Sequence, residues 1–358
     1  MTPRIAVVLM NLGGPDRKES IAPFLRNFFM DPAIIRAPYP VRYMLSRYIA
    51  WKRSRREAGS SYQKLGYKSP LLDHTRDQAN ALQTYLNARN DGRMYNVHVV
   101  MRYWHPMTKE VLKNVLDQNP DQIILIPLYP QFSTTTTGSS YKSWMDEMKR
   151  MESTIPVTLL CCYPDETGWI AASADRVRCA YQELLDQGPG ASKPPRILFS
   201  AHGLPEKIIQ TGDPYQAQTV TTAKAIVNAM EIEHVDYTVC YQSRVGPLKW
   251  IGPSIEEELK RAAADGVPVV VYPHAFVSEH VETLVELDDE YAHVAHELGV
   301  PGYKRASTVL THPDFISALS RMTVGAIGKS GVLSASGVCR CGGHRACPMN
   351  LKNEGKKQ

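Results

Sequence analysis

The sequence predicts a doubly wound α/β protein made of two related halves. Three observations lead to this fold class. Short apolar, β-branched runs alternate with helix-length amphipathic segments along the chain. Similar Gly- and Pro-containing segments follow these runs in both halves. The 358 residues, 43% of them hydrophobic and 22% charged, are enough to bury a sizeable core.

The first half is expected to hold four buried strands. They are predicted at 4–10, 97–103, 122–129 and 155–162. Their hydrophobicity is continuous rather than alternating, which is typical of strands covered on both faces. Such strands are parallel and are joined by helical crossovers.

The second half repeats this pattern. Strands are predicted at 196–200, 236–241 and 267–272, and a helix at 254–264. The two halves join near 165–195, where the Gly- and Pro-rich stretch 187–195 indicates a flexible connection.

Composition and charge exclude several classes of protein. The 41 basic residues barely exceed the 36 acidic ones and are scattered, so no nucleic-acid partner is expected. The N-terminus lacks the features of a signal peptide, and no apolar stretch approaches the ~20 residues of a membrane-spanning helix. We therefore expect a cytoplasmic protein whose seven cysteines are unbridged thiols, catalytic groups or metal ligands.

Chemistry is expected just beyond the strands, because open α/β sheets bind ligands at the carboxyl ends of their strands. The sequence has none of the usual dinucleotide, nucleoside-triphosphate or serine-hydrolase motifs. Another kind of ligand is therefore indicated. The segments that follow strands are NLGGP, RYWHP, YPQFSTTTTGSS, SAHGLP, CYQSRVGP and YPHAFVSEH.

His202 is expected immediately past a buried strand, where Gly203 and Pro205 turn the chain away. A neutral imidazole can bind a divalent metal or accept a proton. From the residues alone, a histidine that merely caps a turn is an equal alternative.

The segment 275–291 predicts a helix that begins at Ser278 as N-cap, with Glu282 near a capping-box position. Apolar residues at helical spacing are expected to face the sheet: Val281, Leu284, Val285, Tyr291 and Val294. Carboxylates four residues apart form a ladder on another face: Glu282, Glu286 and Glu290. The ladder can lead cations or protons to His280 or His202, or it is simply a solvated acidic face.

Seven segments, taken together and in order, resemble the ferrochelatase family over about residues 6–310. They are LMNLGGP, GYKSPL, RYWHP, YPQFSTTTTGSS, FSAHGLP, CYQSRVGPLKWIGP and FVSEHVETLVELDDEY. The resemblance implies two Rossmann-like domains with parallel sheets and a porphyrin cleft between them. We expect these domains at 1–170 and 171–330, followed by a cysteine-containing tail at 331–358.

The resemblance also implies roles for single residues. His202 and Glu282 are expected to be catalytic and to face each other across the porphyrin, from opposite sides of the ring. Contacts with the substrate Fe²⁺ are implied for His202, Glu282, His280 and Glu286. Porphyrin-binding residues are implied at Met10, Tyr103, Ser140 and Trp250. Judged by residue type alone, Met10, Tyr103 and Trp250 are as compatible with the core as with a cleft wall.

Residues 35–57 mix Arg and Lys with Tyr, Met, Ile and Trp in a helix-like stretch. Such a segment can lie on an anionic membrane surface or clamp the propionates of a porphyrin. The family resemblance implies a mobile lip here. Arg53, Arg55 and Arg56 are the residues to test. A solvated basic helix is the alternative.

The tail contains Cys339, Cys341 and Cys347 within nine residues. Three thiols this close indicate a metal site that takes its fourth ligand from elsewhere, although an unfolded tail or a redox pair is the alternative. Some ferrochelatases hold a [2Fe-2S] cluster with a C-terminal cysteine group, and the resemblance implies one here. We expect Cys162 as the interior ligand, with Cys161 as its alternative.

The expected function is insertion of Fe²⁺ into protoporphyrin IX to form protoheme, the last step of heme biosynthesis, by a monomer or homodimer. The alternatives are a coproporphyrin III ferrochelatase and a cobalt or nickel chelatase of another tetrapyrrole. A heme- or iron-sulfur-binding module without activity is the rival from another class. Peripheral membrane contact is expected as well.

Overall fold

The computed structural model describes residues 2–186, 193–244, 248–335 and 344–348. Contacts within the chain divide it into two compact units. In the described parts, the first unit comprises 2–162 and 319–335, and the second comprises 163–318 and 344–348. Each unit is described by itself below.

The first unit is built on a five-stranded parallel sheet with strand order β2-β1-β3-β4-β9. Its central strands, β1 and β3, are almost entirely buried, as their continuous hydrophobicity predicts. The strands are β1 (Arg4–Asn11), β2 (Met94–Met101), β3 (Gln122–Pro127), β4 (Val157–Leu160) and β9 (Gly331–Leu333).

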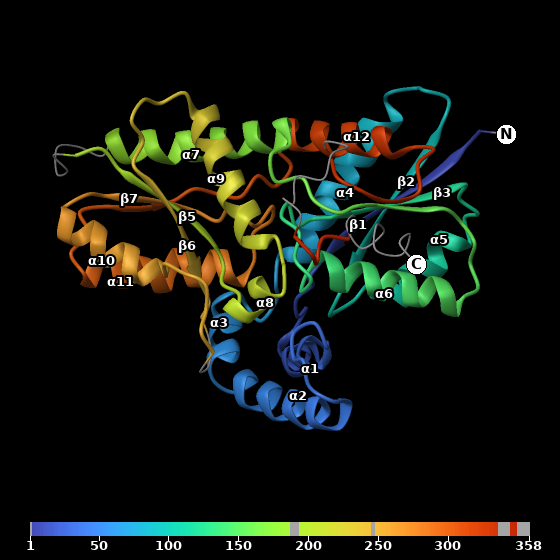
Figure 1. Cartoon of the computed structure of the whole chain (residues 1–358), viewed down its shortest axis with the longest axis horizontal. Coiled ribbons are helices and arrows are strands. Elements are labelled where there is room, and N and C mark those ends of the chain that lie inside the picture. Colours follow the sequence, from blue (N-terminus) through green and yellow to red (C-terminus); the bar gives the residue numbers. More distant parts are fainter. Residues whose placement is uncertain (1, 187–192, 245–247, 336–343, 349–358) are drawn as a thin grey trace. The chain divides into compact units, whose positions relative to one another are not determined.

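Helices lie on both faces of this sheet, with α4 on one side and α5 and α6 on the other (Figure 1). The segment between β1 and α4 forms a separate helical group in which α1 packs against α2. The helices are η1 (Lys18–Ser20), α1 (Ile21–Met30), α2 (Tyr39–Ser54), α3 (Glu57–Lys64), α4 (Leu71–Asn87), α5 (Thr108–Leu116) and α6 (Thr137–Arg150). Helix α12 (Pro313–Ala326) runs from the second unit into the first.

The second unit has a four-stranded parallel sheet with strand order β6-β5-β7-β8. Helices α7 and α9 lie on one face, and α10 and α11 on the other (Figure 1). The strands are β5 (Arg196–His202), β6 (Tyr237–Gln242), β7 (Val269–Tyr272) and β8 (Tyr303–Arg305). The helices are α7 (Thr167–Asp186), α8 (Glu206–Gln210), α9 (Tyr215–Met230), α10 (Ile255–Asp265), η2 (Glu282–Glu290) and α11 (Tyr291–Glu297).

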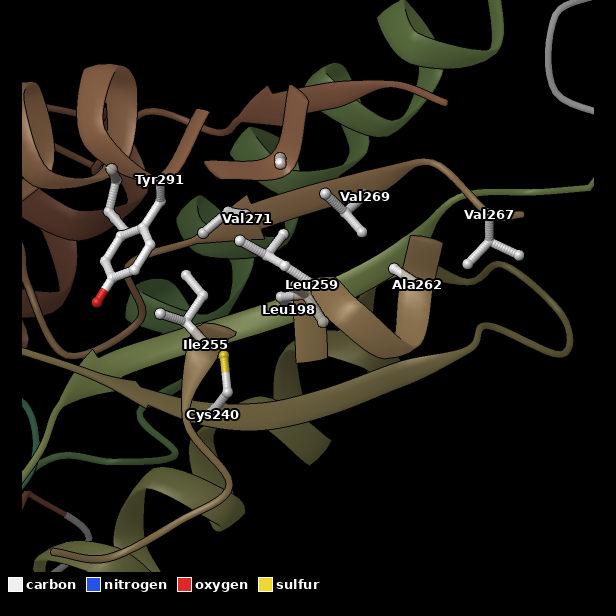
Figure 2. Close-up of a cluster of buried hydrophobic side chains, with 11 residues drawn as sticks. Leu198, Cys240, Ile255, Leu259, Ala262, Val267, Val269, Val271 and Tyr291 are labelled. Carbon is white, nitrogen blue, oxygen red and sulfur yellow. The ribbon is translucent and has the colours of Figure 1, made fainter. Parts of the chain in front are cut away.

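The core of the second unit lies between its sheet and α10 (Figure 2). Ile255 and Leu259 of α10 pack against Leu198 of β5 and Val271 of β7. Ser254 caps α10 by accepting a hydrogen bond from the Glu257 amide, and the Glu257 carboxylate accepts one from the Ser254 amide. This capping box fixes the start of α10, and Ser254 lies beside Tyr241 near the carboxyl end of β6.

The predicted fold class is confirmed, and all seven predicted strands exist with their ends shifted by up to three residues. One shift concerns the site, because β5 continues through His202 instead of ending at residue 200. The structure also divides the chain differently from the predicted ranges. Residues 319–335 belong to the first unit because β9 pairs with β4. The predicted flexible connection falls largely on 187–192, outside the described residues.

The helix predicted from Ser278 was wrong in start and in type. Ser278 is buried outside the helix, and residues 282–290 form a π-helix, η2, preceded by Val281. The wider π turn changes which side chains face inward. Buried positions are Thr283, Val285, Leu287 and Tyr291, whereas Val281, Leu284 and Val294 of the predicted apolar face are only partly buried.

Within the described residues, no helix is long and apolar enough to cross a bilayer.

Candidate active site in the second unit

His202 is the last residue of β5, at the carboxyl end of the second sheet. The hydroxyl of Tyr215 donates a hydrogen bond to the His202 carbonyl at 3.2 Å. Gly203 follows, and a Cβ placed on it would come within 3.3 Å of the Trp250 ring and 3.0 Å of the Gln242 carbonyl. The missing side chain at residue 203 therefore lets the Trp250 indole pack beside the backbone that carries His202.

His202 and Glu282 contact each other directly. Nδ1 of His202 lies 3.1 Å from Oε2 of Glu282, and the two side chains are 37% and 24% exposed. The expected placement on opposite sides of the porphyrin was wrong, because a flat ring between two groups needs about 7 Å, twice a van der Waals contact. In this structure a flat ring therefore cannot lie between the two side chains.

His280 completes this group from the loop before η2. Its Nε2 lies 3.7 Å from the same Glu282 oxygen, and its side chain is 8% exposed. Thr283 fixes the His280 backbone, because its hydroxyl accepts a hydrogen bond from the His280 amide and donates one to the His280 carbonyl. The Phe276 ring packs on the imidazole with centroids 4.6 Å apart.

Glu286 lies one turn further along η2 and is held by residues at the end of β6. The Ser243 hydroxyl lies 2.8 and 2.6 Å from the two oxygens of Glu286, and Nε2 of Gln242 donates to one of them at 3.1 Å. Gln242 also donates to the Glu282 carbonyl. Ser243 has a φ of 64°, in the left-handed region that residues other than glycine rarely adopt. This conformation directs its hydroxyl to the carboxylate.

The environments of the two carboxylates push their pKa values in opposite directions. Burial by itself would raise the pKa of Glu282, but the neighbouring His202 and then His280 lower it well below its usual range. Burial, followed by repulsion from Glu282, raises the pKa of Glu286 to about 7. One carboxylate is thus kept ionised, while the other can exchange a proton near neutral pH.

The predicted ladder of three carboxylates has only two members at this site. Glu290, at the end of η2, is exposed to solvent. The structure therefore brings together His202, His280, Glu282 and Glu286, with Trp250 beside them. Among the described residues, no three His, Cys, Asp or Glu side chains are already arranged as a metal site.

The other predicted porphyrin contacts, Met10, Tyr103 and Ser140, belong to the first unit and are all buried. Met10 and Ser140 line a small void together with Asn11, Val100, Arg102 and Thr108. The Tyr103 hydroxyl donates to Asp31 at 2.8 Å, and Asp31 also accepts hydrogen bonds from Arg102 and Ser139.

Two of the predicted cluster ligands, Cys161 and Cys162, follow β4 and are buried, with their sulfur atoms 3.6 Å apart. The chain that leads to the tail passes beside them. The Cys161 amide donates to the Leu333 carbonyl, and the Ala335 amide donates to the Cys162 carbonyl. Cys347, in the second unit, is buried as well, whereas Cys339 and Cys341 lie outside the described residues.

Sequence reasoning did not single out Gln242, Ser243 and Tyr215. The first two lie in CYQSRVGP, which was recognised as a strand-end segment, so their position was a usable signal. Their role depends on the side-chain hydrogen bonds to Glu286, which residue spacing does not reveal.

Two parallel α/β units, one with paired histidines and carboxylates at a strand end, define the class of chelatase-like α/β proteins. A solved structure, SirB from Bacillus subtilis with Fe³⁺, shares this fold with a TM-score of 0.51. It is 13% identical in sequence, and the match covers 90% of this chain and 96% of that one.

The particular family follows from sequence comparison. The family profile described as Ferrochelatase matches residues 4–326. A ferrochelatase of Caulobacter vibrioides is 47% identical over 343 residues, which cover 96% of each chain. One of Rickettsia bellii is 43% identical over 348 residues, which cover 96% of this chain and 93% of the relative. The chain belongs to the ferrochelatase family and is a metal chelatase of the lyase class.

Proposed function

We propose that this protein inserts Fe²⁺ into protoporphyrin IX and that His202, His280, Glu282 and Glu286 are the groups that act on the ring protons and the iron. The observation that carries the proposal is the His202–Glu282 contact of 3.1 Å at the carboxyl end of β5. Membership in the ferrochelatase family supplies the reaction class.

The geometry supports a proton-accepting role for His202. In this proposal, when His202 is neutral the ionised Glu282 accepts a hydrogen bond from the tautomer that carries its proton on Nδ1, which leaves Nε2 as the basic nitrogen of the ring. Each inner N–H of a free-base porphyrin must lose its proton before the nitrogen lone pairs can bind iron. When Nε2 takes such a proton, the Glu282 carboxylate stabilises the imidazolium that results.

Glu286 is the next acceptor in this proposal, because its pKa of about 7 lets it take up and release protons at neutral pH. Imidazole and carboxylate groups also suit Fe²⁺ as ligands, so the same four side chains can contact the incoming iron. The Trp250 indole beside Gly203 offers a flat apolar surface to the porphyrin.

The test is an anaerobic assay of metal insertion by the purified protein, in which the change in porphyrin absorbance measures the rate. His202→Ala and Glu282→Ala should lower the rate by about 10²–10⁴-fold while porphyrin binding, measured by fluorescence, persists. Glu290→Ala is the matched control, because this carboxylate is on the same helix but exposed, and it should keep the wild-type rate. A wild-type protein that binds porphyrin but inserts no metal would support the non-catalytic binding module instead.

The choice of protoporphyrin IX rests on the apolar character of α2. Turnover with coproporphyrin III distinguishes the two porphyrins, since that ring carries two more carboxylates. A higher kcat/KM with coproporphyrin III would overturn the choice. Parallel assays with Co²⁺ and Ni²⁺ test the alternative metals.

We further propose that α2 contacts the surface of an anionic membrane at the cytoplasmic side. Its large apolar side chains are 39–64% exposed, and Arg55 lies 4.8 Å above the Trp51 ring. Apolar groups mixed with cations are typical of interfacial helices. The exposed apolar residues are Tyr39, Val41, Tyr43, Met44, Leu45, Tyr48 and Trp51.

Flotation with vesicles tests this surface. The wild type should float with anionic vesicles, and replacement of Arg53, Arg55 and Arg56 by Ala should abolish flotation. A matched variant with Ala at Lys109, Lys113 and Lys142, which are exposed on α5 and α6, should still float. Equal flotation of both variants would contradict the proposal.

Finally, we propose that Cys339, Cys341 and Cys347 bind a [2Fe-2S] cluster with Cys162 as the fourth ligand and Cys161 as its alternative. Thiolates are the usual ligands of such a cluster, which can transfer single electrons. The position of Ala335 supports the interior ligand, because the four residues from there to Cys339 span at most about 14 Å.

Cluster absorbance and electron paramagnetic resonance of anaerobically purified Cys→Ser variants test the ligand set. Each true ligand should be required for the full signal. Cys179→Ser, at an exposed position on α7, is the control and should retain it. Loss of the signal in Cys161→Ser but not in Cys162→Ser would make Cys161 the fourth ligand.

A further inference from the structure

Arg305 makes a set of contacts that the proposed chemistry does not use. It is the last residue of β8, the edge strand of the second sheet, and its side chain is 9% exposed. Its guanidinium contacts two carboxylates, Glu279 and Asp288. An arginine keeps its charge at all relevant pH values, so these contacts are permanent.

The two carboxylates flank the segment that carries the candidate catalytic groups. On one side, Nη1 of Arg305 donates to both oxygens of Glu279, at 3.0 and 3.1 Å, and Glu279 directly precedes His280. On the other side, Nε and Nη2 of Arg305 form a paired contact with Asp288, at 2.6 and 2.8 Å. Asp288 lies in η2, two residues beyond Glu286.

Glu279 has a second anchor in the loop after β8. One of its oxygens accepts hydrogen bonds from the amide of Thr308 at 2.8 Å and from its hydroxyl at 3.1 Å. The carboxylate is therefore fully engaged within the fold, 8% exposed, and is directed toward β8. Because Glu279 directly precedes His280, its anchoring also restrains the backbone of His280.

We propose that Arg305 is a positioning residue for metal insertion, because it joins both flanks of segment 279–288 to β8 and so fixes His280, Glu282 and Glu286 relative to His202. This inference rests on the proposed function. The planar guanidinium is essential to this positioning role, since its fork of five N–H groups can donate hydrogen bonds to two carboxylates in fixed directions. Lysine retains the charge but not the fork.

The second unit offers a closely matched control in Arg196. Its side chain is also 9% exposed and also contacts two carboxylates, Asp236 at 2.6 Å and Asp265 at 2.8 Å. Arg196 is the first residue of β5 and His202 the last, so the two are separated by about 20 Å of strand. Replacing Arg196 by Lys therefore also removes guanidinium contacts with two carboxylates, but far from the site.

The experiment compares Arg305→Lys with Arg196→Lys in the full-length protein. Both should lower the midpoint of thermal unfolding, because each variant loses guanidinium contacts with two carboxylates. At a temperature where both are folded, Arg305→Lys should lower kcat/KM for Fe²⁺ at least about 10-fold, and Arg196→Lys by less than about twofold, because small misplacements of reacting groups are costly. Porphyrin affinity, measured by fluorescence, should be unchanged in both.

Hydrogen exchange supplies a readout that does not depend on activity. Amides of segment 279–288 should exchange faster in Arg305→Lys than in the wild type, and those in Arg196→Lys should not. If Arg305→Lys does not fold, Asp288→Asn tests the same point, since it removes one of the two contacts at a position where the carboxylate is 38% exposed.

The two proposals fail in distinguishable ways. A wild-type protein that inserts no metal overturns the proposed function. Amide hydrogen exchange in segment 279–288 then decides whether Arg305 holds this segment in place. An active wild type whose Arg305→Lys variant loses thermal stability but keeps its kcat/KM for iron and its hydrogen-exchange pattern shows that Arg305 only stabilises the fold.

Discussion

The carboxyl ends of the two parallel sheets carry different kinds of polar networks. In the first unit, one carboxylate, Asp31, is surrounded by the guanidinium of Arg102 and the hydroxyls of Tyr103 and Ser139. In the second unit, two carboxylates, Glu282 and Glu286, lie close together. Glu282 contacts His202, and Glu286 accepts hydrogen bonds from Gln242 and Ser243.

The two networks differ in whether their carboxylates are neutralised by a permanent cation. Asp31 is paired with a permanent cation, so its network stabilises one arrangement of side chains. Glu282 and Glu286 have pKa values shifted in opposite directions, which is typical of groups that exchange protons. Two parallel sheets with similar strand orders therefore carry an ion pair in one unit and two carboxylates with oppositely shifted pKa values in the other.

The largest expected effect is on stability in the first unit. Asp31→Ala leaves the Arg102 charge and two buried hydroxyls without their acceptor and should lower the free energy of unfolding by about 3–5 kcal/mol. Glu282→Ala should lower it by less than Asp31→Ala does, because the His202 imidazole that it leaves is partly exposed and can be solvated. Denaturant unfolding of both variants measures this, and equal losses would remove the distinction between the two networks.

A smaller effect, dependent on pH, is expected for Glu286. Its pKa is about 7 in the folded protein and 4.5 in the reference state, so between these values the folded state binds more protons than the unfolded one. The contribution of Glu286 to stability is therefore fully present below about pH 4.5 and is lost as the pH rises through 7.

Glu286→Gln should remove this pH dependence. A shift of more than two units corresponds to roughly 3 kcal/mol, and because the side chain is partly exposed we expect the variant to be about 2 kcal/mol more stable than the wild type at pH 8. At pH 4 the variant and the wild type should have equal free energies of unfolding. Unfolding curves at both values measure the difference, and a gain of the same size at pH 4 would point to packing instead of charge.

The smallest expected effect concerns the strained backbone of Ser243. Ser243→Ala and Ser243→Gly both lose the hydroxyl that binds Glu286, but only glycine adopts a φ of 64° without strain. Ser243→Gly should therefore be about 1 kcal/mol more stable than Ser243→Ala. Identical unfolding midpoints for the two variants would show that the conformation stores no strain.

The predicted strands were reliable because they depend on a strong local signal. Buried parallel strands such as β1 and β3 consist almost entirely of apolar residues, and strand-end positions follow directly from them. His202, Glu282, His280 and Glu286 could be selected in this way together with the family resemblance. Their convergence in one unit is a structural result.

Other features depend on contacts that are remote in sequence. A π-helix has no distinct residue pattern, so segment 278–291 predicted an ordinary helix with a three-carboxylate ladder. The direct His202–Glu282 contact joins residues 80 positions apart, and the anchoring of Glu279 by Arg305 joins residues 26 apart. Neither distance follows from spacing along the chain.

Strand β9 has a consequence for how the chain acquires its structure during synthesis. The first sheet gains its last edge strand only from residues 331–333, after residues 163–318 of the second unit have been made. Until then β4 presents an unpaired edge, the kind of surface that promotes association between nascent chains. The same late pairing brings residues 333–335 beside Cys161 and Cys162, so these two cysteines acquire their neighbours from the end of the first unit late in synthesis.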